Sequence, residues 1–387
     1  MTEPSGRWTV STTAGESVRA FVPDPLPPHP LPDLSALYAK LDRANQAMGR
    51  LDGISRLLPD TKLFLYLYVQ KEALLSSQIE GTQSSLADLL LFEAKQPIHV
   101  EISDVEEVSN YVAAVNHGLE RLRSGFPLSL RLIQEVHAIL LRGGRGARMQ
   151  PGEFRQSQNW IGGSRPGNAV FVPPSVEDLQ PALYALELFL HDEEVKLPTL
   201  VRAALVHVQF ETIHPFLDGN GRLGRLLITL MLCADGVLSD PILYLSLYLK
   251  QNRQTYYDLL NRVRMESAWD VWLEFFLDGV SEVSAQATDS AQRILDLFTE
   301  DRSRIQALGR RASTVLRVHD HLQRQPYTDV AAATDATGLS QPAVAAALRD
   351  LEALGIVRET TGRQRDRVFE YTRYMATLSE GAEPIPP

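Results

Sequence analysis

A glycine-rich loop between two helical segments is the feature that most limits how this chain can fold. Residues 214–225 are His-Pro-Phe-Leu-Asp-Gly-Asn-Gly-Arg-Leu-Gly-Arg, and they lie between an apolar helical pattern over 199–212 and a second one directly after them. Glycine permits positive φ and close approach of the backbone, so the amide groups of Gly219, Asn220 and Gly221 can form an anion-binding nest at a helix N-terminus. The loop therefore predicts a phosphate site at the start of a helix.

The charged side chains of this loop favour nucleotide chemistry. Arg222 and Arg225 are three residues apart on one helix face, and two guanidinium groups suit a polyphosphate better than a single carboxylate. Asp218 is placed to hold a Mg²⁺ ion that shares phosphate oxygens, and His214 suits a general base. Alone, a histidine is most often structural, a Gly-Asn-Gly is a turn, and two arginines form a solvated face. Their combination at these spacings predicts a site.

The same segment resembles the signature of the Fic family, His-x-Phe-x-(Asp/Glu)-Gly-Asn-Gly-Arg-x-x-Arg, without departure. The resemblance covers most of residues 35–300. Fic enzymes transfer AMP from ATP to a hydroxyl of a target protein and release pyrophosphate. The resemblance therefore implies a protein adenylyltransferase that modifies Tyr, Thr or Ser side chains of a target protein and of itself.

The resemblance also implies a role for each loop residue. It assigns His214 to deprotonating the target hydroxyl, Asp218 to Mg²⁺, and Phe216 to anchoring the loop in the core. ATP binding is implied for the nest and the first helical turns, which comprise Gly219, Asn220, Gly221, Arg222, Leu223, Gly224 and Arg225. By position, Tyr257 resembles a Fic residue that contacts the base or ribose, whereas its plain structural interpretation is a half-buried helix tyrosine.

A second motif lies upstream, at the end of an apolar helix. By composition Glu80 is an ordinary surface acid. However, Ser76-x-x-x-Glu80-Gly81 is similar to the inhibitory motif (Ser/Thr)-x-x-x-Glu-(Gly/Asn) of Fic proteins that carry an inhibitory helix before the core. The resemblance implies that Glu80 pairs with Arg225, takes the place of the γ-phosphate and keeps the enzyme mostly inactive.

Two short β-prone runs predict a hairpin within residues 153–174. Residues 159–163 and 168–174 are separated by Ser-Arg-Pro-Gly at 164–167, and this is the strand pair that we predict before the C-terminal section. Its position matches the flap of Fic proteins, which pairs with the target segment as an added strand. A purely structural hairpin is the alternative.

The helical periodicity elsewhere predicts a mainly α fold in four parts. Residues 1–33 form a proline-rich N-terminal arm, because the prolines between Pro23 and Pro32 favour extended chain. Residues 34–110 form an N-terminal helical region with the inhibitory helix, and residues 111–300 form the Fic core. Residues 305–378 form a small winged helix-turn-helix domain.

The C-terminal part resembles a winged helix because a glycine turn joins two helices and a basic hairpin follows them. Arg358, Arg363, Arg365 and Arg367 suit contact between the wing and phosphates. The second helix, over 341–354, is rich in alanine and poor in groups that contact bases. DNA binding, formation of a homodimer and target docking therefore remain alternatives for this domain.

Bulk composition excludes several classes of protein. The net charge of −10 argues against the whole chain as a polyanion binder, and the single Cys233 excludes an internal disulfide. Without an apolar leader or a membrane-length apolar run, we expect a cytoplasmic protein with no membrane partner. Two other functions stay open, namely a DNA-binding regulator whose core senses nucleotide and a Fic enzyme that removes AMP.

Overall fold

The computed structural model describes residues 3–13, 15–55, 61–94, 96, 100–143, 145–363 and 365–384. Residues 1, 2 and 14 of the expected arm and Gln364 of the expected wing lie outside the described residues. The predicted mainly α fold is confirmed, since helices dominate and the strands that are described form two small sheets.

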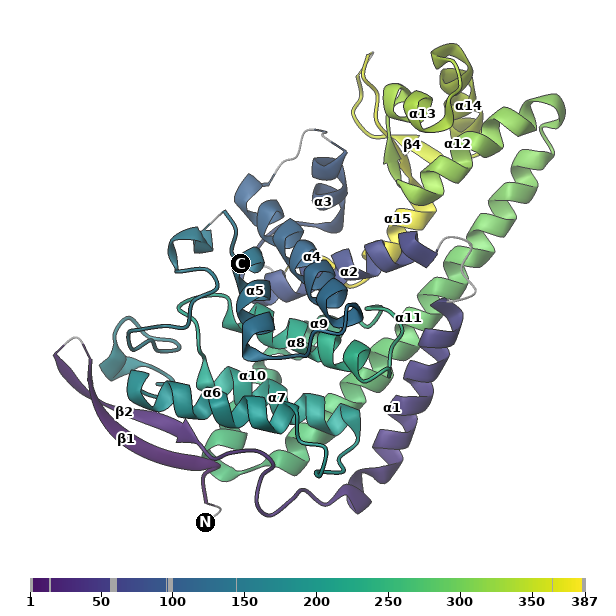
Figure 1. The fold of residues 1–387 in the computed structure, drawn as a ribbon. Coiled ribbons are helices and arrows are strands. Elements are labelled where there is room, and N and C mark those ends of the chain that lie inside the picture. The colour runs from purple at the N-terminus through teal and green to yellow at the C-terminus, as the bar shows by residue number, and fades with distance from the viewer. Residues whose placement is uncertain are drawn as a thin grey trace.

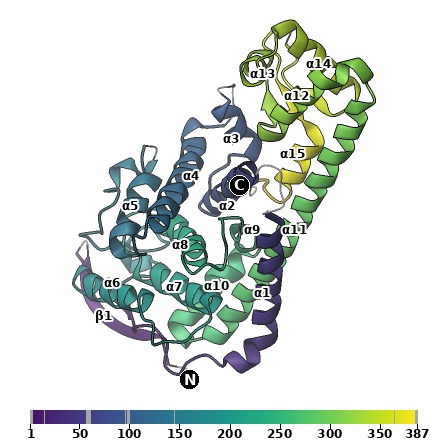
Figure 2. The same ribbon diagram turned by 45° about the vertical axis from the view of Figure 1, so that its right-hand side comes forward.

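The longest helix runs along one side of the molecule. Helix α11 (Trp269–Gln306) extends from the central body to a small C-terminal unit, and α1 (Leu34–Ser55) packs along it in both ribbon views (Figures 1 and 2). Apolar side chains on one face of α11 cause this packing. Neither α11 nor any other helix of the described residues is long and apolar enough to cross a membrane.

The central body consists of helices α2 to α10. Their bounds are α2 (Thr61–Ile79), α3 (Leu86–Glu93), α4 (Ile102–Arg123), α5 (Leu130–Leu140), α6 (Val176–Leu190), α7 (Thr199–Ile213), α8 (Asn220–Ala234), α9 (Ser246–Gln251) and α10 (Arg253–Glu266). Polar caps define several of the helix starts. Ser129, at the N-cap of α5, accepts a hydrogen bond from the amide of Leu132.

Helix α8 follows the glycine-rich loop and lies at the centre of this body. It packs against α2, α4, α5 and α7, and every residue from Arg222 to Leu232 is buried. A helix with apolar side chains on all its faces is stable only inside a core. Its burial carries the loop arginines into the interior, where a guanidinium group needs partners.

The N-terminal segment corrects the prediction of an extended arm. Strands β1 (Gly6–Thr13) and β2 (Glu16–Pro23) form an antiparallel hairpin in register from Gly6–Pro23 to Thr13–Glu16. The ring of Trp8 packs edge-on against that of Phe21, and β2 packs against α6 and α7. Aromatic and β-branched residues in alternation stabilise these strands. The prolines begin only where β2 ends.

The predicted flap hairpin is also only partly present. Its two arms are joined by a single antiparallel bridge between Ile161 and Phe171 rather than by two strands. Gly162 and Gly163 adopt positive φ, and Pro166–Asn168 forms a short 3₁₀ turn. These conformations do not fit a strand, so the ladder stops after one pair. The amide of Phe21 donates to the carbonyl of Val172, which ties the flap to β2.

Two expected domain boundaries fall inside helices. The boundary between residues 110 and 111 lies within α4, and the linker expected between 300 and 305 lies within α11. Buried residues at helical spacing, including Leu297, Asp301 and Ile305, continue α11 through that linker. The central body and the C-terminal unit are therefore joined by continuous helix.

The C-terminal unit combines short helices with a three-stranded antiparallel sheet of order β3-β5-β4. Tyr371 at the end of β5 donates a hydrogen bond to Asp301 of α11 and contacts His319, both of them buried. The elements are α12 (Ala312–Arg324), β3 (Tyr327–Thr328), α13 (Val330–Thr337), α14 (Gln341–Ala353), β4 (Val357–Glu359), β5 (Phe369–Tyr371) and α15 (Thr372–Ser379). The winged-helix assignment stays a prediction.

The end of this unit docks on α2. The Gln78 side chain donates to the backbone carbonyls of Ser84 and Ala382, at 2.9 and 3.0 Å. Its oxygen accepts a hydrogen bond of 2.7 Å from Lys250, which also donates to the carbonyl of Gly381. Gln78 and Ala382 are buried. One side chain of α2 therefore holds the segment after α15 against the central body.

We predict that Gln78→Leu lowers the free energy of unfolding by about 1–3 kcal/mol, because it removes the donor to the carbonyls of Ser84 and Ala382 and one acceptor of Lys250. Urea denaturation followed by circular dichroism measures this. The control is Gln46→Leu on α1, whose exposed side chain bonds only to Asp42 one turn away and should change stability by less than about 0.5 kcal/mol. Equal effects of the two substitutions would contradict the prediction.

Candidate functional site

The glycine-rich loop turns sharply between α7 and α8. His214 ends α7 in the left-handed conformation, with φ of 49° and ψ of 61°, and Gly219 precedes α8 with φ of 77°. A left-handed histidine is uncommon, because its Cβ crowds the backbone there. The surrounding contacts must therefore hold His214 in place.

Side chains from the flap and from α8 hold the loop. The guanidinium of Arg155 donates to the carbonyl of His214 at 3.0 Å, and Asn159 donates to the carbonyl of Phe216 at 2.9 Å. Asn220 closes the loop on itself, because its side chain accepts from the amide of Phe216 and donates to the carbonyl of the same residue. The signature asparagine thus shapes the loop rather than facing outward.

Phe216 anchors the loop in the core, as the resemblance to the family signature implies. Its ring stacks on that of His137 of α5, with centroids 3.6 Å apart, and packs against Phe154. His137 contacts the carbonyl of Asp218 through Nε2 and accepts from the amide of Gly152 through Nδ1. Burial lowers the pKa of His137 to about 4, so the ring is neutral near pH 7.

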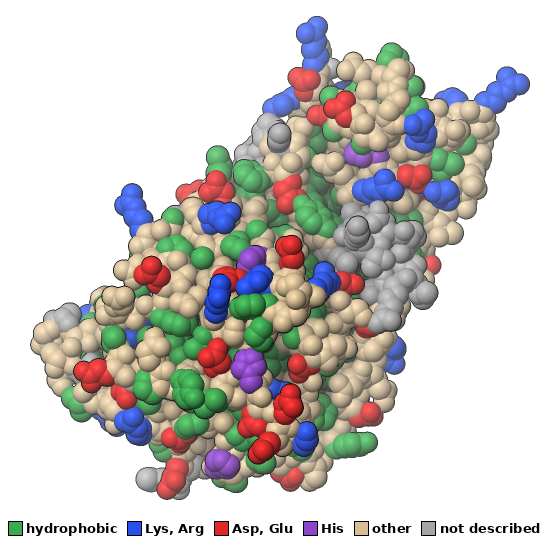
Figure 3. Space-filling model, viewed as in Figure 1, with side chains coloured by type: hydrophobic (Ala, Val, Ile, Leu, Met, Phe, Trp, Pro, Cys, Tyr) green, Lys and Arg blue, Asp and Glu red, His purple; other side chains and the backbone are tan. Residues whose placement is uncertain are grey.

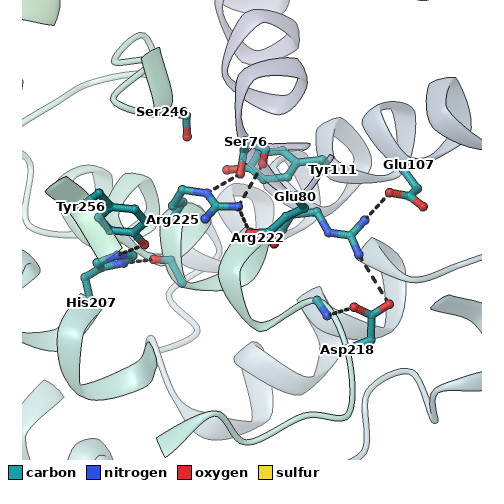
Figure 4. Close-up of polar contacts among 12 residues, drawn as sticks. Ser76, Glu80, Glu107, Tyr111, His207, Asp218, Arg222, Arg225, Ser246 and Tyr256 are labelled. Carbon is teal, nitrogen blue, oxygen red and sulfur yellow. Dashed lines mark hydrogen bonds and ion pairs between the residues drawn. The ribbon is translucent and has the colours of Figure 1, made fainter. Parts of the chain in front are cut away.

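The second arginine of the loop is bound to α2. Arg225 is 2% exposed and donates from Nη2 to Glu80 at 2.6 Å and to the carbonyl of Ser76 at 3.0 Å. Its Nε donates to the hydroxyl of Ser76 at 2.9 Å (Figure 4). Burial opposes ionisation of both groups, but their mutual attraction raises the pKa of Arg225 and lowers that of Glu80. Gly81 follows with φ of 104° and turns the chain away.

The first arginine is bound to a residue that the sequence did not indicate. Arg222 donates to Glu107 of α4 at 2.9 Å, and both side chains are buried (Figure 4). Asp218 lies 3.8 Å from Arg222 and accepts from the amide of Gly219 at 2.7 Å. In α4, Glu107 is one acid among several on a helix, and no sequence signal separates it from the others.

Two cavities meet at His214. One, of about 340 Å³, lies between the flap and α10 and is lined by residues that include Phe171, Tyr256, Leu260 and Asn261. The other, of about 280 Å³, is polar and is lined by the loop from Leu217 to Arg222 together with Glu107. Glu80, His214 and Gly221 line both cavities. We call them the flap cavity and the loop cavity.

The remaining predicted site residues divide into two groups. Tyr257 lines the flap cavity and is 38% exposed, so it can meet a ligand there. Leu223 and Gly224 line neither cavity. Leu223 is fully buried in the core, and the carbonyl of Gly224 accepts from His207 at 3.0 Å. The structure thus places Leu223 and Gly224 behind the site, because the helix turns them away from the loop.

Two family models match the chain. The model described as Fic/DOC family N-terminal matches residues 38–120, and the model described as Fic/DOC family matches residues 127–232. The chain belongs to the Fic/DOC family. The second match contains the loop, and the first contains α2 and the part of α4 that carries Glu107.

Relatives with known names agree with this family. The chain is 31% identical over 275 residues to the protein adenylyltransferase Fic of Aedes aegypti, and 30% identical over 272 residues to that of Culex quinquefasciatus. Each alignment covers 67% of this chain and 47% of the relative. The chain thus spans about half the length of these two relatives.

Solved structures agree in fold. A Fic family protein from Desulfovibrio desulfuricans superposes with a TM-score of 0.55 at 19% identity, over 87% of this chain and 96% of the other. A Fic domain containing signaling protein from Bacteroides thetaiotaomicron gives 0.52 at 19% identity, over 64% and 95%. These likenesses support the Fic fold.

Burial of the ring and two nearby arginines keep His214 neutral in the folded chain. Enclosure of the ring, together with the nearby Arg264 and Arg155, lowers the pKa of His214 to about 3. Both arginines bind backbone close to the histidine, and Arg264 donates to the carbonyl of Glu211 and the hydroxyl of Thr212. Neither Arg155 nor Arg264 could be predicted from the sequence, because single arginines outside a motif carry no local signal.

We predict that His207→Gln makes stability less dependent on pH. His207 is buried and bonds to Tyr256 and Gly224, and burial lowers its pKa to about 3. Only the unfolded chain protonates this ring between about pH 6.5 and 3, so folding stability falls as pH falls through that window. Between pH 5.5 and 4.5, the substitution should reduce that slope by about 1.4 kcal/mol per pH unit.

Urea denaturation at several pH values measures the slope. Tyr256→Phe is the matched control, since it removes the same hydrogen bond and keeps the imidazole. It should lower stability without changing the slope. An unchanged slope in His207→Gln would show that this ring takes up a proton in the folded chain.

Proposed function

We propose that this chain is a protein adenylyltransferase that transfers AMP from ATP to a hydroxyl side chain of a target protein, and to itself, and releases pyrophosphate. The observation that carries the proposal is the position of neutral His214 between two cavities of opposite character. The loop cavity offers amides and arginines to phosphates, and the flap cavity offers aromatic and apolar walls to a nucleoside. The names of the insect relatives support the same reaction.

The loop geometry suits this reaction. The amides at the start of α8 and the side chain of Arg222 would receive phosphate oxygens, which places the α-phosphate near His214. His214 would accept the proton of the target hydroxyl while that oxygen bonds to the α-phosphorus. The bond from phosphorus to the bridging oxygen then breaks, and pyrophosphate leaves with its electron pair. Tyr257 would contact the base or ribose.

Asp218 fits the Mg²⁺ ion that the family implies. Its carboxylate lines the loop cavity beside Gly219 and is 42% exposed, so one carboxylate faces the space where phosphates would lie. Magnesium typically binds one or two carboxylates, phosphate oxygens and water. When bound, the ion would offset charge that develops on the departing pyrophosphate. No further acid needs to approach for this coordination.

The contacts of Arg225 support autoinhibition by Glu80. A carboxylate 2.6 Å from Nη2 occupies one of the donors that a terminal phosphate would need. Glu80 is 37% exposed because it borders both cavities, and Ser76 fixes the guanidinium from the other side. Glu80 and ATP would therefore compete for Arg225, and the resting chain would be mostly inactive.

Two other functions give different experimental outcomes. If the chain removes AMP, Glu80 would align water beside His214, and its loss would abolish activity.

A DNA-binding function for the C-terminal unit has less support, since Arg358 pairs with Glu370 and Arg311 with Asp350. On the face in Figure 3, basic side chains of that unit alternate with acidic ones. Duplex binding that weakens steeply with added salt would favour it.

We predict that Glu80→Gly raises self-modification at least about tenfold. Loss of the ion pair frees Arg225 for the nucleotide, and a change of about 1.4 kcal/mol in that equilibrium corresponds to a tenfold shift. Incubation with ATP labelled at the α-phosphate and mass spectrometry measure the adduct. Adding His214→Ala should lower the Glu80→Gly rate by about 10²–10⁴.

Glu193→Gly is the control, since it removes an exposed glutamate in the loop between α6 and α7, outside both cavities. It should behave like the unmodified chain. Equal labelling of the unmodified chain and Glu80→Gly would refute inhibition, and labelling that survives His214→Ala would refute the base. Absence of an AMP adduct in every variant, both on the chain itself and on any protein added as acceptor, would refute the transfer reaction.

A further inference from the structure

Glu211 is a buried carboxylate in the wall of the flap cavity. It lies on α7, three residues before His214, and is 6% exposed. Its Oε1 atom has no hydrogen-bond partner among the described residues. Buried carboxylate oxygens are normally paired, because an unpaired one has lost water without compensation. This oxygen lies toward Gly224 of α8, so the described part of the chain leaves the carboxylate without a partner there, and its place in the cavity wall is what brings it within reach of a ligand.

The two nearest cations are engaged elsewhere. Arg264 donates to the backbone carbonyl of Glu211 and to the hydroxyl of Thr212, and its guanidinium lies 4.0 Å from the ring centre of Phe171. Arg225 donates to Ser76 and Glu80. None of these contacts reaches the Glu211 carboxylate. A simple role as counter-ion of either arginine does not account for its position.

Helix α8 packs behind the Glu211 carboxylate and leaves space for it at Gly224. A Cβ atom built on Gly224 would lie 2.4 Å from Oε1 of Glu211. This is shorter than a van der Waals contact between carbon and oxygen, so any side chain at this position would displace the carboxylate. Burial, and to a smaller extent Glu80, raises the pKa of Glu211 to about 7, although Arg225 and Arg264 act in the opposite direction. Near neutral pH the group can therefore both donate and accept hydrogen bonds.

The neighbours of Glu211 in the cavity indicate what kind of ligand it meets. Tyr257, Leu260 and Asn261 of α10 line one side, and Val170 and Phe171 of the flap line the other. A flat aromatic ligand fits such walls, and one polar group at the end of an apolar pocket typically sets orientation and selectivity. The phosphate end of the same ligand would lie in the loop cavity, beyond His214.

We propose that Glu211 is a specificity-determining residue that hydrogen-bonds a polar group on the nucleoside part of the bound nucleotide. The inference rests on the proposed function, because it needs a nucleotide that spans both cavities. The group it contacts is an N–H or O–H donor. Two sources have this chemistry, the exocyclic amino group of adenine and a hydroxyl of the ribose.

The test measures equilibrium binding by isothermal titration calorimetry, in full-length Glu80→Gly protein so that Arg225 is free. The probes are ATP, inosine triphosphate, which lacks the amino group, and 2′-deoxy and 3′-deoxy ATP, which each lack one hydroxyl. We expect one analogue to bind at least about tenfold more weakly than ATP, since a site built to bond a group rejects ligands without it. The weakened analogue identifies the source.

Variants then connect that preference to Glu211. Glu211→Ala should weaken ATP binding at least about tenfold and remove the discrimination against the weakened analogue, whereas Glu211→Gln keeps an acceptor and a donor and should restore most of both. Glu193→Ala, at an exposed glutamate between α6 and α7 and outside the cavity, should change neither. Thermal unfolding of each variant checks its fold, and the analogue series on the parent does not depend on that check.

The outcomes separate this inference from the function on which it rests. If the parent binds all four nucleotides equally, or if Glu211→Ala folds and binds ATP within twofold of the parent, the role of Glu211 is refuted while the proposed function stands. If the parent binds none of the nucleotides, the proposed function fails, and the inference fails with it.

Discussion

The buried guanidinium of Arg225 is the group around which the site is organised. It lies on a core helix with almost no access to water, so it must be paired inside the protein. Ser76 of α2 and Glu80, which directly follows that helix, provide the pairing. Loss of either partner of a buried ion pair leaves the charge of the other partner uncompensated. The same donors would be needed by a phosphate, so the contact that stabilises the resting arrangement is also the contact that a nucleotide would have to replace.

The acids that pair with the two loop arginines come from the N-terminal family region, whereas the arginines themselves come from the core. Glu80, just after α2, pairs with Arg225, and Glu107 on α4 pairs with Arg222. Both helices pack directly on α8. The C-terminal unit contacts α2 as well. Gln78, which lies only two residues before Glu80, donates a hydrogen bond to the carbonyl of Ala382. The C-terminal unit therefore contacts the end of the helix that directly precedes the pairing acid. This gives three parts of the chain a physical connection to one guanidinium.

Local chemistry determined how far the sequence could predict this structure. The loop could be predicted, because glycine, asparagine and arginine at this fixed spacing suit a phosphate site and little else, and the pairing of Glu80 with Arg225 followed from a motif. The hairpin of β1 and β2 was missed, since a run of prolines next to it drew attention to extended chain. Glu107, Glu211 and Arg264 were missed for a different reason. Each is a charged helix residue outside any motif, and its role arises only when helices distant in sequence pack together.

Electrostatics also explains how proton transfer can depend on nucleotide binding. In the resting chain, enclosure and the charges of Arg264 and Arg155 lower the pKa of His214 to about 3, so the ring is neutral but a weak base. A polyphosphate in the loop cavity would bring several negative charges to the other side of the ring, and nearby negative charge favours the protonated form. The basicity of His214 would then rise only when its substrate is present. A histidine with an ordinary pKa in the resting chain would already be partly protonated at neutral pH, and the same phosphate charge would protonate it further, so that it could no longer accept the proton of the hydroxyl.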